Sequence, residues 1–277
     1  MNVTRTGQPH VSRRTALRTW IVRSASLLLL TACAGPASAM PDGSGARTGG
    51  AAPAARTSSV GAAGASASSA TARQELPACI LTPQQTEGPY FVDERLHRTD
   101  IRSDPTDGSV RDGIPLHLTL LVSQVAGQSC TPLAGTYVDL WQCDALGVYS
   151  DVDDRSTGSR AGTSKFLRGY QVTDENGQVQ FTTIFPGWYG GRAVHIHFKV
   201  RTALDAGSAR EMVSQLYFDD GQIDQIHALP PYAARGQRTT RNDRDFLFRQ
   251  GGDKLIVPIA PDTDGYTGTF NLGVQLT

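Results

Sequence analysis

Hydrophobic and polar residues alternate strictly along residues 194–200, the most regular stretch of the chain. The apolar positions are Val194, Ile196, Phe198 and Val200. The polar positions between them are His195, His197 and Lys199. Because successive side chains of a strand leave opposite faces, this pattern predicts a β-strand with one apolar face and one face that carries two neighbouring imidazoles. Two such imidazoles can share a metal ion, although an H-x-H pair is also typical of an ordinary polar sheet face.

Short apolar or alternating runs recur between turn residues along the rest of the chain. The predicted strands are Leu116–Val122, Tyr137–Gln142, Gly169–Thr173, Val179–Ile184, Val194–Val200, Val213–Phe218, Leu255–Ile259 and Thr267–Leu276. The Asn-Gly pair within Asp174–Gly177 predicts a tight hairpin turn. Sustained helical periodicity is missing, although Arg241–Arg249 is compatible with a short helix. The sequence therefore predicts an all-β fold, an antiparallel β-sandwich.

The strands are confined to the C-terminal part of the chain. Residues 34–75 consist almost entirely of Ala, Gly, Ser, Thr and Pro, a composition that cannot bury enough apolar surface to form a core. This stretch is expected to be a linker. The globular domain is expected to span residues 76–277.

Residues 1–33 have the pattern of an export signal. The pair Arg13-Arg14 precedes an apolar run, Ser24–Leu30, that is too short to span a bilayer, which predicts export by the twin-arginine route. The run ends in Leu30-Thr31-Ala32-Cys33, which resembles a bacterial lipobox. That resemblance implies a lipidated Cys33 and peripheral membrane attachment at the cell surface; the alternative is ordinary cleavage near residues 37–39 and a secreted product.

The charge of the mature protein argues against a nucleic-acid partner. The whole chain has 26 basic and 26 acidic residues, but residues 1–32 hold five arginines and no acidic residue. Their removal leaves 21 basic against 26 acidic residues, so the exported product is acidic and is not expected to bind DNA or RNA.

Export also places the remaining cysteines in an oxidising compartment. Cys79, Cys130 and Cys143 are three in number, so the simplest expectation is one disulfide and one free thiol. The sequence leaves open which two form the pair.

Two tyrosines and an arginine occur in turns beside the predicted H-x-H strand. The glycine-bent corner Trp188–Arg192 can direct Tyr189 and Arg192 back toward the two histidines, and a second turn after Tyr137–Gln142 carries Tyr149. With these pieces in this order, the sequence resembles the intradiol ring-cleavage dioxygenases, the non-haem iron enzymes of catechol and protocatechuate breakdown. The resemblance spans roughly Leu81 to Phe218. It is carried by Thr82–Phe91 (TPQQTEGPYF), Gly147-Val148-Tyr149, Phe166–Tyr189, Arg192–Phe198 (RAVHIHF) and Ser214–Phe218 (SQLYF).

The resemblance implies a role for six residues. Tyr149, Tyr189, His195 and His197 match the four ligands of an Fe(3+) ion. Arg192 matches the arginine that stabilises the charged substrate, Gln215 matches a glutamine beside the ligands, and Tyr189 doubles as a base that leaves the iron. Two features depart from the family pattern. Tyr189 and His195 are only six residues apart, and the linker replaces a helical N-terminal segment.

The implied activity is ring cleavage of a catechol-type substrate by O2 to give a muconate-type diacid. Two phenolates suit a trivalent ion better than zinc, because a phenol with a pKa near 10 needs a strong Lewis acid to stay ionised at neutral pH. One alternative is a non-catalytic, surface-anchored β-sandwich module that binds aromatics or carbohydrate. Another is a zinc or copper hydrolase built on H-x-H, but the motif lacks a neighbouring carboxylate base. The choice of catechol and the oligomeric state stay open.

Overall fold

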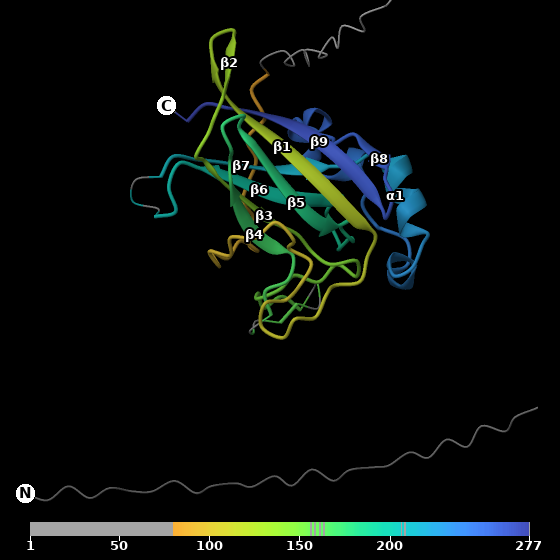
Figure 1. Ribbon diagram of the computed structural model, residues 1–277. Coiled ribbons are helices and arrows are strands. Elements are labelled where there is room, and N and C mark those ends of the chain that lie inside the picture. The colour runs from red at the N-terminus through yellow and green to blue at the C-terminus, as the bar shows by residue number, and fades with distance from the viewer. Residues whose placement is uncertain are drawn as a thin grey trace, which may run out of the picture. The chain divides into compact units, whose positions relative to one another are not determined.

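The computed structural model describes residues 80–276, except for residues 156, 158, 161, 163, 206 and 208. Regular structure in this part is mostly β-strand, arranged in two sheets (Figure 1). The predicted all-β sandwich is therefore confirmed. The export signal, the linker and Cys33 lie outside the described residues, so the domain boundaries and the lipobox remain predictions. Within the described part, none of the helices has the length and apolar character that crossing a bilayer requires.

The first sheet is built around its longest strand, β1 (Pro115–Ala126). Strand β9 (Tyr266–Val274) pairs with β1 in parallel, while β5 (Gln178–Ile184) and β2 (Ser129–Pro132) pair with it antiparallel along the opposite edge. The short β8 (Ile259–Pro261) extends the sheet beyond β9. The β1–β9 pair corrects the expectation of a purely antiparallel sandwich.

The second sheet is antiparallel throughout and has the order β4-β3-β6-β7. Its strands are β4 (Arg168–Val172), β3 (Tyr137–Trp141), β6 (His195–Arg201) and β7 (Glu211–Tyr217). The apolar positions Ile196, Phe198 and Val200 of β6 join one buried core with Leu118 and Leu120 of β1. The alternation along residues 194–200 thus points the apolar face into the sandwich, as the pattern predicts.

The outer, polar face of the second sheet is covered by residues 81–97, named the strap below. Lys199 of β6 forms an ion pair with Glu87 of the strap at 2.9 Å, and Arg201 forms one with Asp93 at 3.0 Å. Ser214 of β7 donates to the carbonyl of Pro83 at 2.7 Å. Every residue of β6 is consequently buried, on the polar face as well as on the apolar one.

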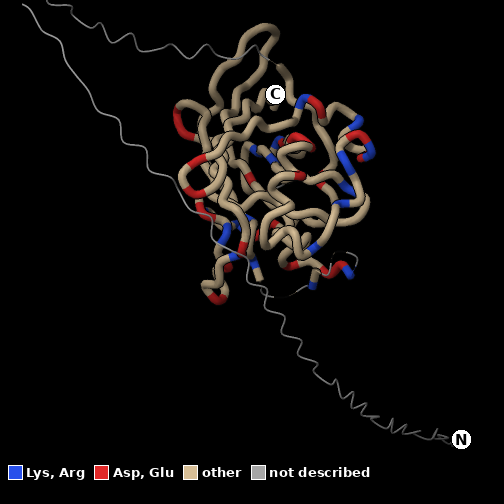
Figure 2. Tube along the Cα trace, turned by 90° about the vertical axis from the view of Figure 1, so that its right-hand side faces the viewer, with Lys and Arg blue, Asp and Glu red and all other residues tan. Residues whose placement is uncertain are grey.

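Opposite charges are interspersed along the described chain (Figure 2). Helix α1 (Asp220–His227) is an example, because its two carboxylates, Asp220 and Asp224, pair with two guanidiniums, those of Arg238 and Arg241. Pairing of this kind leaves local charge balanced over this part of the surface.

Three predicted elements differ from the structure. The turn Asp174–Gly177 is present, closed by the Gly177 amide donating to the Asp174 carbonyl at 3.0 Å, but β4 and β5, which it joins, belong to different sheets. The predicted strand Leu255–Ile259 is displaced, because Leu255 ends a 3-10 turn and Pro258 lacks a donor, so only Ile259 lies in a strand, as the first residue of β8. Residues 241–249 do not form one helix, since Asp245 is extended between two short 3-10 turns, Asn242–Arg244 and Phe248–Gln250.

Two short elements of the structure were not predicted from the sequence. Helix α1 is only eight residues long and begins where the Asp219 carboxylate accepts from the amides of Gly221 and Gln222. Strand β2 has only four residues. Elements this short do not complete enough periods to be recognised.

The cysteines agree with the expected count. Cys130 is disulfide-bonded, and Cys143 is a buried free thiol whose pKa is raised by burial. Cys79 lies outside the described residues.

Candidate metal centre

The polar face of β6 places both histidines between two other strands. His197 lies opposite Trp141 of β3 on one side and Gln215 of β7 on the other, and His195 lies opposite Tyr217 of β7. The Trp141 indole stacks on the His197 ring, with centroids 4.9 Å apart and planes 9° apart. This packing fixes the His197 ring and assigns Trp141 a place in the wall of the site.

The two tyrosine-bearing turns meet because both contain a glycine at the point of contact. Gly147 has φ +82°, and a Cβ there would lie 2.2 Å from the carbonyl oxygen of Trp188. A Cβ on Gly187 would lie 2.4 Å from the carbonyl oxygen of Asp144. Only glycine permits such an approach. The Tyr149 turn is further closed by the Asp144 carboxylate, which accepts from the amides of Leu146 and Val148 at 2.9 Å each.

The four predicted ligands come together at this junction. The Tyr189 hydroxyl lies 3.1 Å from Nε2 of His195, and the Nε2 atoms of His195 and His197 are 3.0 Å apart. The Tyr149 ring lies against the Tyr189 ring at 5.7 Å between centroids. All four side chains are buried. The Tyr149 hydroxyl is buried with no hydrogen-bond partner in the described part of the chain.

The imidazoles are held in the state that a metal ligand requires. Nδ1 of His195 donates to the carbonyl of Ala193 at 2.6 Å, which leaves Nε2 with its lone pair directed at the cluster. Burial lowers the pKa of His195 and of His197 well below the ordinary value, and the charge of Arg192 adds to both shifts. Both rings are therefore neutral at neutral pH.

The pKa values of the two tyrosines are shifted in the opposite direction to those of the histidines. Burial raises the pKa of Tyr149 and of Tyr189 well above the ordinary value, so neither ionises unaided at neutral pH. A buried phenol without a hydrogen-bond partner is costly, and a strong Lewis acid would remove that cost by binding the phenolate. Across the described residues no cluster of three His, Cys, Asp or Glu side chains exists that could hold a metal. Two phenols and two neutral imidazoles form a donor set that fits Fe(3+).

Tyr90 of the strap is the neighbour that packs closest on Tyr149. The two rings stack with centroids 4.3 Å apart, and Tyr90 also meets Tyr189 edge-on at 5.8 Å. The Tyr90 hydroxyl donates to the carboxylate of Asp154. The strap therefore supplies one wall of the site.

Arg192 and Gln215 are linked in one hydrogen-bonded network. Nη2 of Arg192 donates to Oε1 of Gln215, and Nε donates to Asp245 at 2.9 Å. The Tyr217 hydroxyl is also within hydrogen-bond distance of two amide oxygens, Oε1 of Gln215 at 3.2 Å and Oε1 of Gln85 at 2.9 Å. Arg192 keeps a fifth of its side chain exposed, whereas Asp245 is buried. Asp245 and Gln215 thus fix the orientation of the Arg192 guanidinium, and part of the side chain stays accessible to solvent.

Three residues of this network were not identified from the sequence. Tyr217 was detectable, since it alternates with Gln215 on the strand next to His195. Gln85 lies within the Thr82–Phe91 motif, but its link to Tyr217 depends on the fold. Asp245 gave no signal, because it is far from every motif in sequence and reaches Arg192 only through the fold.

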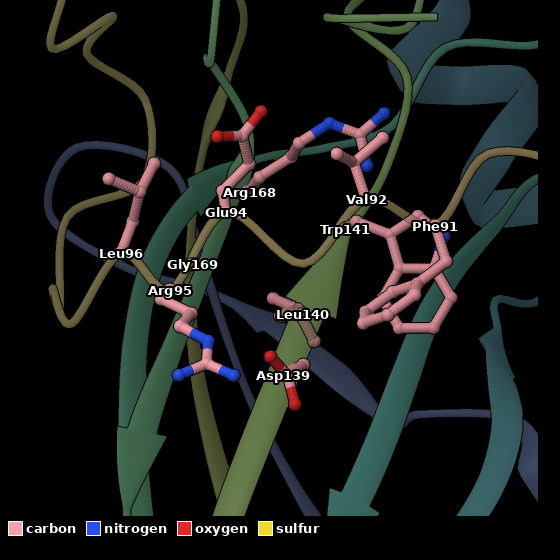
Figure 3. A pocket seen from close by; sticks show the side chains of 10 residues that line it. All are labelled: Phe91, Val92, Glu94, Arg95, Leu96, Asp139, Leu140, Trp141, Arg168 and Gly169. Carbon is pink, nitrogen blue, oxygen red and sulfur yellow. The ribbon is translucent and has the colours of Figure 1, made fainter. Parts of the chain in front are cut away.

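A guanidinium is also buried behind Tyr149. Arg168, at the start of β4, donates to the carbonyls of Ser150 and Tyr90 at 2.6 Å each. Burial lowers the pKa of Arg168 to about 10. Arg168 lines a small cavity together with Trp141, Asp139 and Glu94, among others (Figure 3). That cavity holds only about 10 Å³, so it accommodates one water and is not a substrate site.

The neutral imidazoles predict a pH dependence of stability in metal-free protein. Because the folded state holds both rings neutral below pH 6.5, the unfolded chain binds more protons there. The free energy of unfolding should therefore fall as the pH drops below about 6.5, by up to about 1.4 kcal/mol per pH unit for each imidazole. Urea unfolding between pH 7.5 and 5 measures this slope. His197→Gln should reduce the slope, and an unchanged slope would contradict the assignment.

The part of the chain that contains this site is similar to known proteins. The family described as Dioxygenase matches residues 86–235. The protocatechuate 3,4-dioxygenase beta chain of Burkholderia cepacia is 31% identical over 154 residues, which are 51% of this chain and 63% of the relative. The catechol 1,2-dioxygenase of Acinetobacter baylyi is 29% identical over 154 residues, 49% of this chain and 45% of the relative. The chain thus spans about half to three-fifths of these two relatives.

Two solved structures are similar to this protein over a larger share of its chain. An intradiol ring-cleavage dioxygenase from Tetranychus urticae is 36% identical with a TM-score of 0.60, covering 71% of this chain and 95% of its own. The dioxygenase domain of a dioxygenase–carbohydrate-binding fusion from Streptomyces sp. SirexAA-E is 29% identical with a TM-score of 0.50, covering 72% and 100%. From the matched residues, the fold and these likenesses, the chain belongs to the intradiol ring-cleavage dioxygenase family.

Proposed function

We propose that this protein is an Fe(3+)-dependent dioxygenase that cleaves a catechol-type ring between its two hydroxylated carbons. The observation that carries the proposal is the donor cluster itself. Tyr189, His195 and His197 direct polar atoms at one another within 3.1 Å, beside a buried Tyr149 hydroxyl that has no partner in the described chain. An unpaired buried hydroxyl is costly in a protein interior, and a bound metal ion would remove that cost.

A ferric ion bound by these four side chains would withdraw electron density from a bound catecholate and so make its ring reactive toward O2. Both oxygen atoms enter the product, the bond between the two hydroxylated carbons breaks, and two carboxylates form. Four electrons leave the substrate and reduce O2 completely, so the reaction consumes no external reductant. The product is a muconate-type diacid.

Tyr189 is suited to accept a proton from the substrate. It is less deeply buried than Tyr149, with 7% of its surface exposed against 1%, and its hydroxyl already contacts Nε2 of His195. As a phenolate, its Oη would take up one catechol proton as the substrate binds. Tyr149, enclosed by Tyr90 and by the turn that carries it, is the ligand that would stay in place.

Arg192 is placed to stabilise negative charge on the substrate. Its guanidinium donates to Gln215, which lies opposite His197 on the neighbouring strand, so its positive charge is held next to the cluster. Gln215 and Asp245 fix the guanidinium before substrate arrives, and a preorganised charge of this kind lowers the energy of an anionic transition state.

A surface-anchored module that binds aromatics or carbohydrate without catalysis is the second candidate. The linker of residues 34–75 would serve such a module equally well. The module, however, has no use for two buried phenols beside a histidine pair. Colour separates the candidates, because phenolates bound to Fe(3+) absorb visible light.

Purified protein should contain about one iron per chain, be red-brown and consume O2 with a catechol. Tyr149→Phe should lose most of the colour and iron, because it removes a ligand. Tyr189→Phe should keep part of the iron but lose most turnover. Tyr170→Phe, on β4, is the matched control and should resemble the wild type. Iron analysis, visible spectra and an oxygen electrode with catechol, hydroxyquinol, protocatechuate and caffeate provide the measurements. Colourless, iron-free protein that still binds aromatics would support the module instead.

Replacing Arg192 should affect catalysis more than iron binding. Arg192→Gln is expected to lower kcat about 100- to 1,000-fold, since a preorganised charge at the reacting centre is lost. Iron content should stay close to that of the wild type, because no metal donor changes. Arg249→Gln, an exposed arginine, is the control. An Arg192→Gln enzyme with wild-type kcat would exclude the proposed role.

We also propose that the protein is exported by the twin-arginine route and anchored through a lipidated Cys33. The paired arginines, the short apolar run and the lipobox-like Leu30–Cys33 support this localisation. A route that moves folded proteins would let iron bind before export.

Cell fractionation tests the anchor. Wild-type protein should enter the detergent phase, and Cys33→Ala should shift it to the aqueous phase or the medium. Arg13→Lys combined with Arg14→Lys should retain the precursor inside the cell. Wild-type protein found wholly in the aqueous phase would indicate ordinary cleavage near residues 37–39 instead.

A further inference from the structure

The guanidinium of Arg168 connects the two segments that enclose Tyr149. Its Nη2 and Nε donate to the main-chain oxygen of Ser150, at 2.6 and 3.1 Å, and Ser150 directly follows Tyr149. Its Nη1 donates to the main-chain oxygen of Tyr90 at 2.6 Å. Since the Tyr90 ring stacks on the Tyr149 ring, one side chain holds both the turn that carries the phenol and the ring that packs against it.

Arg168 differs from the other buried cations of this sheet in having no carboxylate partner. Lys199 pairs with Glu87, and Arg201 pairs with Asp93 and with Asp139 at 2.8 Å. Arg168 is only 2% exposed, yet no carboxylate lies within 4.0 Å of it among the described residues, and all its hydrogen-bond acceptors are neutral oxygens.

An unpaired buried charge is expensive, commonly by several kcal/mol, so an anion near Arg168 would be strongly favoured. A dissolved anion has no room there. The neighbouring cavity, with Glu94 and Trp141 among its lining residues, holds about 10 Å³, which is the space of a single water (Figure 3). The two acidic residues that line this cavity already have partners, since Glu94 pairs with Lys165 and Asp139 pairs with Arg201.

The missing partner is provided by the site itself. The Tyr149 hydroxyl is buried and has no hydrogen-bond partner in the described chain, and Arg168 fixes the residue that follows it. Because Arg168 is hydrogen-bonded to the residue that follows Tyr149, a phenolate at Tyr149 would lie on the turn that the guanidinium holds and would offset its unpaired charge.

We propose that Arg168 is the positioning residue for Tyr149: its three main-chain hydrogen bonds clamp the Tyr149 turn to Tyr90 of the strap, and its charge balances the metal-bound Tyr149 phenolate. This inference rests on the proposed function, in which Tyr149 binds Fe(3+). Arg168 does not contact substrate. Arg168 acts through Tyr149 in two ways. It keeps the Tyr149 ring in place, and its positive charge stabilises the negative charge on the phenolate oxygen.

The experiment compares iron-loaded full-length wild type, Arg168→Met, Arg168→Lys and Arg98→Met. Arg98 is the matched control, because its guanidinium is half-buried and donates to main-chain oxygens of the same segment, at Lys165 and Arg168, without a hydrogen bond to Ser150 or Tyr90. The readouts are iron per chain, the wavelength of the phenolate-to-iron absorption band and the reduction potential of the iron.

Arg168→Met should shift the absorption band to longer wavelength, because the phenolate loses its counter-charge and its electrons rise in energy. The same loss should lower the reduction potential and the iron content. Arg168→Lys keeps a charge but not the clamp, so its band should stay near the wild-type wavelength while iron content falls. Arg98→Met should leave the band in place.

An Arg168→Met protein with the wild-type wavelength, potential and iron content would overturn the inference. An equal band shift in Arg98→Met would overturn it as well, since a general disturbance of the segment would then be the cause. If Arg168→Met does not fold, Arg168→Gln replaces it, because glutamine keeps polar contacts without the charge and should shift the band in the same direction. A wild type without iron or colour would instead refute the proposed function, and the inference with it.

Discussion

The burial of both faces of β6 is the constraint on which the rest of the structure depends. Its apolar face completes the sandwich core, and its polar face is enclosed by the strap and by two turns. An enclosed polar face is stable only when its charges are paired and its polar atoms are bonded. Lys199 and Arg201 satisfy this condition through Glu87 and Asp93. His197 and Tyr149 satisfy it only in part, since each keeps a buried polar atom without a hydrogen bond in the described chain, and both belong to the candidate metal centre.

Two guanidiniums, one partly exposed and one buried, lie near this candidate centre and differ in how their charges are compensated. Arg192 is paired with the buried Asp245 and keeps an accessible edge, so it is prepared for an anionic ligand from outside. Arg168 is nearly inaccessible and bonded only to neutral oxygens, so its charge acts inward on the donor set. In the proposed function, Arg192 would therefore serve the substrate and Arg168 the protein's own phenolate.

Much of this arrangement was readable from local patterns. The strict alternation of residues 194–200 predicted β6, its two faces and the neighbouring histidines, because strand geometry fixes side-chain direction every second residue. Ordered motifs placed Tyr149, Tyr189, Arg192 and Gln215 in one site. Other local patterns misled: Asn176-Gly177 forms the expected turn, yet the strands on either side diverge into different sheets, since packing against β3 and β1 outweighs the hairpin preference.

The sequence by itself determined the all-β class and the residue types of the candidate donor set, since these depend on local patterns and on contacts between near neighbours. Only the tertiary structure decided the parallel β1–β9 pair, the network through Asp245, Tyr217 and Gln85, and the unpaired charge of Arg168. Those features join segments as much as 150 residues apart in β1 and β9. Their energies depend on burial and on distance in space, and neither is written in the order of residues along the chain.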